Sequence, residues 1–208
     1  MFASPNSTKK QLTPTRITRI ATIAALYAAL TLTCMVFLGG LSWGPVQLRI
    51  SEAVCVLALL TADAVPGLAL GCAIANIANI ALSGTGLLGL LDVVFGTLAT
   101  TLGALVTWRL RDRPSLALLG PVLTNGLIVP AYLPLLLQGL GFYTIPFTSI
   151  ALDGAYPAMY LFGLVATGLG EGLVLYVLGL PLFRALLASP LPQRLRQDED
   201  ASSSAEGV

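Results

Sequence analysis

The chain contains no histidine and few charged residues, and these absences exclude several kinds of function. Charged side chains make up 10% of its 208 residues and cancel to a net charge of +1, which argues against nucleic acid as a partner. Without histidine the chain lacks the commonest proton shuttle and metal ligand. It also has no HExxH motif, no phosphate-binding loop and no aspartate pair of the intramembrane protease kind. We therefore expect a protein that is not an enzyme, holds no metal or cofactor and hydrolyses no ATP by itself.

Cysteine is scarce as well. The three cysteines, Cys34, Cys55 and Cys72, all lie within apolar runs. Free cysteine in such surroundings packs as a small hydrophobic residue, so we predict buried thiols without a metal or redox role.

Apolar residues, by contrast, are abundant. They make up 56% of the chain, and the mean hydropathy is +0.86, more than a soluble domain of this length needs. Several windows supply the roughly 20 apolar residues of a membrane-spanning helix, and none alternates as a barrel strand does. The sequence thus predicts an all-α, multi-pass protein of the cell membrane.

We expect six transmembrane helices in one membrane domain, residues 16–187, between disordered cytoplasmic tails at 1–15 and 188–208. Ser51 is a plausible N-cap of the second helix. The last helix is long for one span, so tilt, a break near 179–181 or an amphipathic end are all compatible with it. Prolines 121, 130 and 134 are expected to kink the fifth helix. The predicted helices are about 16–38, 51–62, 64–82, 90–110, 116–138 and 156–187.

The basic residues predict the orientation of these helices. Six spans place both termini on one side, and ten of the 11 basic residues fall on that side. The positive-inside rule makes it cytoplasmic and leaves Arg49 alone on the outer side. The ten are Lys9, Lys10, Arg16, Arg19, Arg109, Arg111, Arg113, Arg184, Arg194 and Arg196.

The segment GPVQLRISEA, residues 44–53, interrupts two apolar runs and carries Arg49 and Glu52 three residues apart. A charge among apolar helices costs roughly 2.5–3.5 kcal/mol on insertion scales, so it usually faces a cavity or a partner. The topology puts both residues at the outer end of the second helix. We interpret the segment as the lip of a binding site, with a purely structural ion pair as the alternative.

Further polar residues are expected in the outer half of the bundle. Asn side chains donate and accept hydrogen bonds and carboxylates accept them, so this set suits a small, flat molecule rich in N–H donors. Tyr132, Phe142, Tyr143, Tyr156 and Tyr160 could stack on its ring. The predicted polar residues are Asn76, Asn79, Asp92, Asn125 and Glu171.

Each polar residue also has a structural interpretation. The three asparagines could bridge helices, Asp92 could be an N-cap at a helix dipole, and Glu171 could pair within the bundle.

The first helix carries a different pattern. Ala21, Ala25 and Ala29 recur every four residues, and Ala24 and Ala28 widen the stripe. Small residues at this spacing let another helix approach closely. That helix belongs either to a partner subunit or to the same chain.

Four motifs resemble the QueT family, the queuosine-precursor transporters among the substrate-binding S-components of energy-coupling factor (ECF) transporters. They are GPVQLRISEA (44–53), PGLALGCAIAN (66–76), LGLLDVVFGTLAT (88–100) and VLTNGLIV (122–129). The resemblance covers about residues 16–187.

The resemblance implies a six-helix S-component with no cofactor, which captures its substrate outside and associates with a transmembrane coupling subunit and two ATPases. It would then topple in the bilayer to release the substrate inward. Ala21, Ala25 and Ala29 would form the docking surface. The implied substrate is a 7-deazaguanine base with an aminomethyl or cyano group.

In this scheme one carboxylate accepts from the guanine-like edge and a second meets the aminomethyl cation. The candidate substrate-binding residues are Arg49, Glu52, Asn76, Asn79, Asp92, Asn125, Tyr160 and Glu171. Three alternatives stay open: an S-component for another vitamin or base, a stand-alone secondary transporter with Glu171 as its coupling site, and a membrane scaffold without transport activity.

Overall fold

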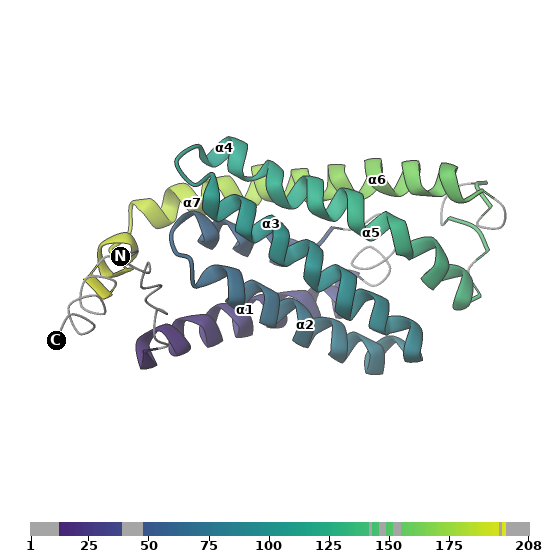
Figure 1. Ribbon diagram of the computed structural model, residues 1–208, viewed down its shortest axis with the longest axis horizontal. Coiled ribbons are helices and arrows are strands. Elements are labelled where there is room, and N and C mark those ends of the chain that lie inside the picture. Colours follow the sequence, from purple (N-terminus) through teal and green to yellow (C-terminus); the bar gives the residue numbers. More distant parts are fainter. Residues whose placement is uncertain are drawn as a thin grey trace, which may run out of the picture.

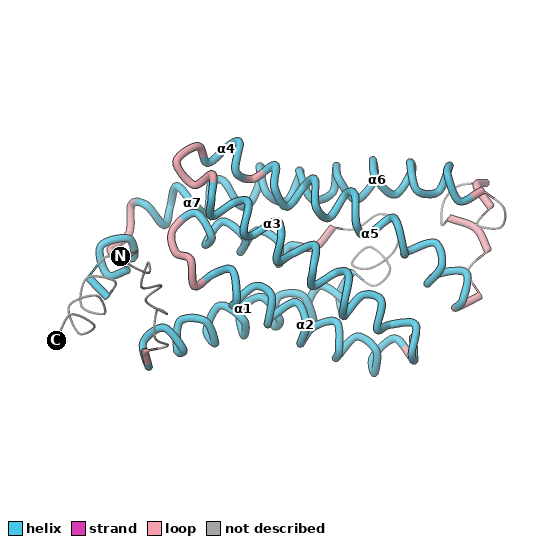
Figure 2. The backbone as a smooth tube through the Cα atoms, viewed as in Figure 1, coloured by secondary structure: helices cyan, strands magenta, loops and turns pink. Residues whose placement is uncertain are grey.

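Long helices packed lengthwise form the bundle in the computed structural model, which describes residues 13–38, 48–141, 143–145, 149–151, 155–195 and 197–198 (Figure 1). Within the described ranges the only β-type pairing is an isolated bridge between Thr144 and Ala151, and helices make up most of the rest (Figure 2). The elements are α1 (Pro14–Leu38), η2 (Ile50–Leu59), α2 (Ala64–Ser83), η3 (Gly86–Gly89), η4 (Asp92–Gly96), α3 (Thr97–Arg109), α4 (Pro114–Ala117), α5 (Leu119–Gly139), α6 (Tyr156–Leu173), η5 (Val174–Gly179) and α7 (Leu180–Leu187).

Five helical stretches of the described chain are long and apolar enough to cross a membrane. The remaining predicted span, 51–62, is the short helix η2, a 3-10 helix of 10 residues. Ten such residues rise about 20 Å, which is less than the roughly 30 Å of a bilayer core. The structure therefore supports five of the six predicted spans, and η2 is too short to be the sixth. The five are Pro14–Leu38, Ala64–Ser83, Gly86–Arg109, Pro114–Gly139 and Tyr156–Leu187.

The helices alternate in direction, so that α1 begins and α7 ends at the same end of the bundle (Figure 1). An ion pair of 2.8 Å between Arg19 and Asp198 joins these two parts of the chain. Residues 191–195, inside the tail predicted to be disordered, are helical. We call this the basic end, because it carries Arg16, Arg19, Arg109, Arg111, Arg113, Arg184 and Arg194.

Helices α1 and α2 pack closely because α2 presents two glycines, Gly67 and Gly71, to α1. A Cβ atom on Gly71 would lie 2.7 Å from the carbonyl oxygen of Ala24, and one on Gly67 would lie 2.9 Å from the side chain of Ile23. Small residues four apart allow such an approach between membrane helices. Ala24 and Ala28 are buried in this contact.

The other three alanines of α1 point away from the bundle. Ala21, Ala25 and Ala29 are exposed, so the stripe predicted as one surface divides into two faces. Only Ala24 and Ala28 serve packing within the chain.

Helix α5 continues through Pro130 and Pro134. Each proline removes a backbone donor and disturbs the preceding turn. Tyr160 donates a hydrogen bond to the Leu127 carbonyl at 3.3 Å, and Tyr156 donates one to the Ala131 carbonyl at 2.8 Å. Both carbonyls lie three residues before a proline, so two tyrosines of α6 support the two weakened turns of α5. Pro121 lies in the first turn of α5, where no intrahelical bond is lost.

The apolar core has two parts. One, nearer the basic end, includes Tyr27, Leu68 and Leu175, and the other includes Val129, Leu136 and Met159. Glu52 contacts Tyr27 of the first part and Asp92 contacts Tyr132 of the second, which places these two carboxylates in the middle of the bundle.

Candidate binding site

Seven of the eight predicted substrate-binding residues are buried in the bundle. Each of the seven is no more than 6% exposed. Polar groups at that depth are stable only when they are hydrogen-bonded or paired. The seven are Arg49, Glu52, Asn76, Asn79, Asp92, Asn125 and Glu171.

Glu52 lies deeper than the sequence suggests. The hydroxyl of Tyr27, near the midpoint of α1, donates to one of its carboxylate oxygens, and the thiol of Cys55 donates to the other at 3.1 Å. Residues three apart are aligned in a 3-10 helix, which sets Cys55 beside Glu52. The expected position at the outer end of a full span is therefore wrong, because η2 begins in the middle of the bundle and runs to the basic end.

Ser51 does not cap this helix. The N-cap position of η2 is occupied by Arg49, whose side chain makes no capping bond. Ser51 lies in the first turn, fully buried, and its hydroxyl has no hydrogen-bond partner.

Glu171 lies at the midpoint of the stretch Tyr156–Leu187. The side-chain amide of Asn125 on α5 donates to its carboxylate at 3.2 Å. A Cβ atom on Gly126 would lie 3.5 Å from Gly168, so the backbones of α5 and α6 lie close together near the level of the pair. Asn125 therefore bridges α5 and α6, as its structural interpretation predicts, and its partner is the buried carboxylate of Glu171.

Asp92 begins a π-helical turn inside the stretch Gly86–Arg109. The N-cap position of this turn is Leu91, which is itself helical. The carboxylate of Asp92 accepts from the Tyr132 hydroxyl at 2.7 Å, and its backbone carbonyl accepts from the Asn76 amide at 2.8 Å. The N-cap alternative is thereby excluded. Turns of this kind often occur at functional sites.

Gly96, at the end of the same turn, leaves room for these contacts. A Cβ atom there would lie 3.1 Å from the Asn76 amide nitrogen and 3.4 Å from the Tyr132 hydroxyl. The ring of Tyr132 stacks on Phe95 with centroids 5.7 Å apart. An aromatic surface thus adjoins the Asp92 carboxylate.

Arg49 connects two layers of this network. Tyr132 is seven residues beyond Asn125 on α5, which puts the Asp92 layer about 10 Å farther from the basic end than the Glu171 layer. The guanidinium of Arg49 interacts electrostatically with Asp92 and Tyr132 of one layer and with Glu171 of the other. A structural ion pair with Glu52, the alternative considered from the sequence, therefore does not account for all the interactions of Arg49.

Two predicted site residues stand apart from the network. Asn79 accepts a hydrogen bond of 2.6 Å from Ser83 on its own helix. Tyr160 binds the carbonyl of Leu127, as described above, and is stacked with Tyr156. Tyr143 and Tyr156 are exposed, and Phe142 lies outside the described residues.

The network includes side chains that sequence reasoning missed. Tyr27 and Cys55 bind Glu52, while the thiol of Cys72 accepts from Thr100 at 3.4 Å and from Asn76 at 3.5 Å. Two features of the sequence could have indicated these residues: a tyrosine in the middle of an apolar helix, and cysteines placed one helical turn from Glu52 and Asn76. No group of three or more acidic or cysteine side chains in the described ranges could hold a metal ion.

Unpaired hydroxyls adjoin both glutamates. Ser51 precedes Glu52, and Thr167, 2% exposed, lies one turn from Glu171 on the same buried face of α6. Neither hydroxyl makes a hydrogen bond to a residue that the structure describes. An unsatisfied buried polar group costs about 1–3 kcal/mol, so these groups retain the capacity to bind a polar molecule.

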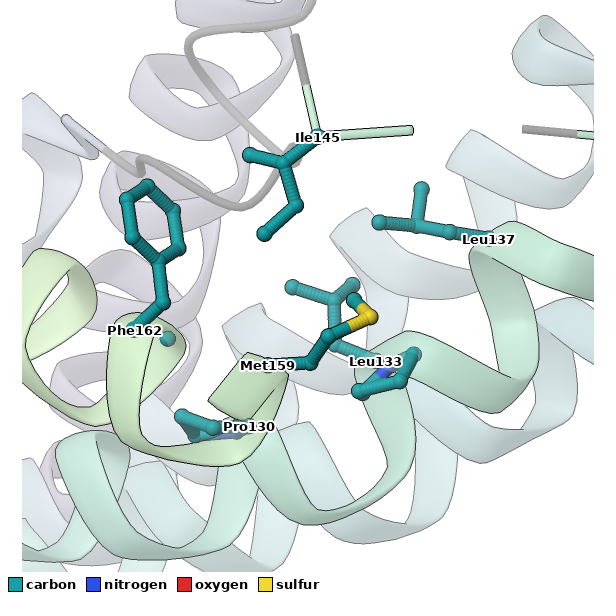
Figure 3. A pocket seen from close by; sticks show the side chains of 8 residues that line it. Pro130, Leu133, Leu137, Ile145, Met159 and Phe162 are labelled. Carbon is teal, nitrogen blue, oxygen red and sulfur yellow. The ribbon is translucent and has the colours of Figure 1, made fainter. Parts of the chain in front are cut away.

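A separate, apolar pocket lies between α5 and α6, where the side chain of Ile145 points toward both helices (Figure 3). None of its lining residues has a polar side chain, so it offers no groups to orient a polar ligand. The lining residues are Pro130, Leu133, Pro134, Leu137, Ile145, Met159, Phe162 and Gly163.

Apolar helices of membrane-spanning length around buried charged and amide side chains define the class: a multi-pass membrane protein with an internal polar site, as transport proteins have. The chain belongs to the QueT transporter family, whose sequence model matches residues 17–188. Membership of this family makes it a transport protein. No curated protein and no solved structure matches the chain.

Proposed function

We propose that this chain is the substrate-binding membrane subunit, or S-component, of an ECF importer and that it takes up a 7-deazaguanine base, a precursor of queuosine. The observation that carries the proposal is the buried network of Glu52, Asp92, Asn125 and Glu171 around Arg49, in a member of the QueT transporter family. Five of the network's groups can accept or donate at different edges of one planar base.

The chemistry of the network suits a guanine-like ring. A carboxylate accepts from the ring N–H and the exocyclic amine together, as proteins do when they bind a base removed from a helix. Asparagine amides and the guanidinium supply donors for the ring carbonyl. The stacked pair of Phe95 and Tyr132 offers an aromatic surface beside Asp92.

Binding can be tested on the isolated chain. Purified in detergent, it should bind a 7-deazaguanine base tightly without ATP, sodium or a proton gradient, as measured by titration calorimetry. Competition with other vitamins and bases is the control for specificity. Binding of another vitamin, with no heat from any 7-deazaguanine, would reject the proposed cargo and keep the S-component.

Energy for transport would come from a coupling subunit and two ATPases in the cell membrane, with the basic end in the cytoplasm. The exposed face of Ala21, Ala25 and Ala29 supports docking of such a partner, because small residues permit close helix approach.

A matched pair of variants tests the docking face. Ala25→Trp should leave binding by the isolated chain nearly unchanged and abolish uptake in cells, because the bulky ring blocks the partner. Ala24→Trp should lose binding and uptake together, because Ala24 packs against Gly71. Full uptake by Ala25→Trp would reject the docking face.

A secondary transporter is the second candidate. The observation that favours it is Glu171, a carboxylate buried at mid-span beside a second carboxylate, which is a position suited to a proton-carrying site. Uptake by the chain alone in vesicles, driven by a proton gradient and independent of ATPases, would support this candidate against the first.

A further inference from the structure

The carboxylate of Glu52 is held on both of its oxygens by donors from two different helices. The hydroxyl of Tyr27 on α1 binds one oxygen, and the thiol of Cys55, on the same helix η2 as Glu52, binds the other at 3.1 Å. All three side chains are no more than 1% exposed. Protein groups, and not bulk water, therefore determine the direction in which this carboxylate points.

The two donors are not equivalent. Cys55 lies one turn along η2 and moves together with Glu52, and a thiol is a weak donor. Tyr27 belongs to another helix, and a hydroxyl that donates to a carboxylate makes one of the stronger hydrogen bonds in proteins. The bond from Tyr27 is thus the one that fixes the Glu52 carboxylate relative to the rest of the bundle.

Tyr27 is itself held in place on several sides. It is among the largest fully buried side chains of the described chain. A Cβ atom on Gly71 would lie 3.0 Å from its Cβ atom, so the backbone of α2 packs directly against it. The hydroxyl of Thr31 donates to its backbone carbonyl at 2.9 Å, and the thiol of Cys72 also interacts with it. A side chain held in this way can orient a neighbouring group.

The Glu52 carboxylate retains capacity for a ligand. It accepts two hydrogen bonds from described residues, although a carboxylate can accept about four. The remaining positions suit the ring N–H and exocyclic amine of a guanine-like edge. Resting on the function proposed above, we infer that Tyr27 is a positioning residue for the substrate: its hydroxyl holds the Glu52 carboxylate in the orientation in which it accepts from the ligand. A group oriented before the ligand arrives increases affinity, because less ordering is required on binding.

The first test is Tyr27→Phe in the purified full chain, with the aminomethyl 7-deazaguanine as the probe in calorimetry or competition. Phenylalanine keeps the ring and its packing against Gly71 and removes only the hydroxyl. The affinity should fall roughly threefold to tenfold. Cys55→Ala should reduce it by a smaller factor, because the thiol is the weaker donor. A cooperative thermal transition of each preparation shows that the variant is folded.

A double-mutant cycle separates positioning from a structural role. When Glu52→Leu has removed the carboxylate, adding Tyr27→Phe should change the affinity by less than about twofold, because Tyr27 acts through the missing group. A structural role of Tyr27, or one exerted through Cys72, would instead lower the affinity by the same factor in both backgrounds. Glu52→Gln is a second background if Glu52→Leu does not fold. Its neutral amide accepts more weakly, so the factor for Tyr27→Phe should be smaller than in the parent.

Tyr132→Phe is the matched control. It removes the same kind of hydroxyl from the other layer of the network, where the partner is Asp92. Its effect on affinity should be the same with and without the Glu52 carboxylate, since it does not act through Glu52.

Three results would overturn the inference. An unchanged affinity of Tyr27→Phe would show that Glu52 needs no orientation by α1 and would leave the proposed cargo intact. Equal factors for Tyr27→Phe in the parent and in Glu52→Leu would assign Tyr27 a structural role. Binding of no 7-deazaguanine by the parent would reject the proposed cargo and, with it, the inference.

Discussion

The molecule contains two charged networks, and they use carboxylates in opposite ways. At the basic end, Asp63 is paired with Arg16 and Arg19 through contacts of 2.9 Å on both of its oxygens, and Arg19 is also paired with Asp198, so the charges of this network balance. In the middle of the bundle, Glu52 and Glu171 accept hydrogen bonds from neutral groups, and the charged neighbours of Glu171 are Glu52 and the single guanidinium of Arg49. A compensated carboxylate stabilises the fold; an uncompensated one at this depth needs another partner.

The largest effect is expected from Arg49→Gln, which removes the cation that joins the two layers of the interior. Breaking a buried charge pair costs roughly 3–5 kcal/mol, less what protonation of a carboxylate recovers. Both the unfolding midpoint in detergent and the affinity for the aminomethyl base should fall. Arg184→Gln, an exposed position of the basic end, is the control and should change neither. Unaltered stability of the Arg49 variant would contradict the contrast drawn between the two networks, because the interior would then tolerate the loss of its cation.

Glu52→Gln should separate affinity from stability. The amide keeps an oxygen for Tyr27 and removes one of two neighbouring like charges, so the unfolding free energy should stay within about 1 kcal/mol of the parent. The affinity for the aminomethyl base should fall roughly tenfold to a hundredfold. Calorimetry and thermal unfolding on the same preparation test both expectations. The prediction is wrong when stability falls and affinity does not.

Asp63→Asn should give the reverse result. It removes the carboxylate that pairs with Arg16 and leaves Arg19 with Asp198 alone, and a partly exposed network of this kind lies between surface and buried pairs in energy. We expect a loss of about 1–2 kcal/mol in the free energy of unfolding and no change in affinity. Equilibrium unfolding together with calorimetry measures the two quantities. A loss of affinity would mean that the two networks are coupled.

The smallest effect is expected from Asp198→Asn. Asp198 is 45% exposed in its pair with Arg19, and exposed pairs contribute about 0.2–1 kcal/mol. The variant should lower the unfolding midpoint slightly at low salt and not at all at high salt, because salt screens exposed charges. A large, salt-independent loss would instead indicate that residues beyond α7 form part of the fold.

The sequence was sufficient for the long helices. Hydropathy placed spans at 16–38 and 64–82, close to Pro14–Leu38 and Ala64–Ser83. Hydropathy could not predict that η2 is short, because ten apolar residues look the same whether they form a short helix or part of a full transmembrane span. Only the tertiary contact between Glu52 and Tyr27 reveals that this helix begins in mid-bundle.

The same limit applies to the candidate site. The seven charged and amide residues chosen from the apolar helices are all buried, since such groups avoid lipid, and their role in substrate binding stays a prediction. Tyr160 was grouped with them because tyrosine suits many positions near a membrane surface, and its bond to Leu127 depends on how α6 is rotated against α5. Rotation about a helix axis follows from packing, which no single helix specifies.

The 3-10 form of η2 has a consequence for the lengths of chain that this protein can tolerate. The first turn of η2 is attached to Tyr27 through Glu52. The connection that follows the helix is attached to Arg16 and Arg19 through Asp63. The same ten residues wound as an α-helix would be about 5 Å shorter and would fail to reach both attachments. Deleting one residue would also rotate Glu52 by about 120° relative to Asp63. Natural and engineered variants should therefore accept insertions and deletions in this helix least of all.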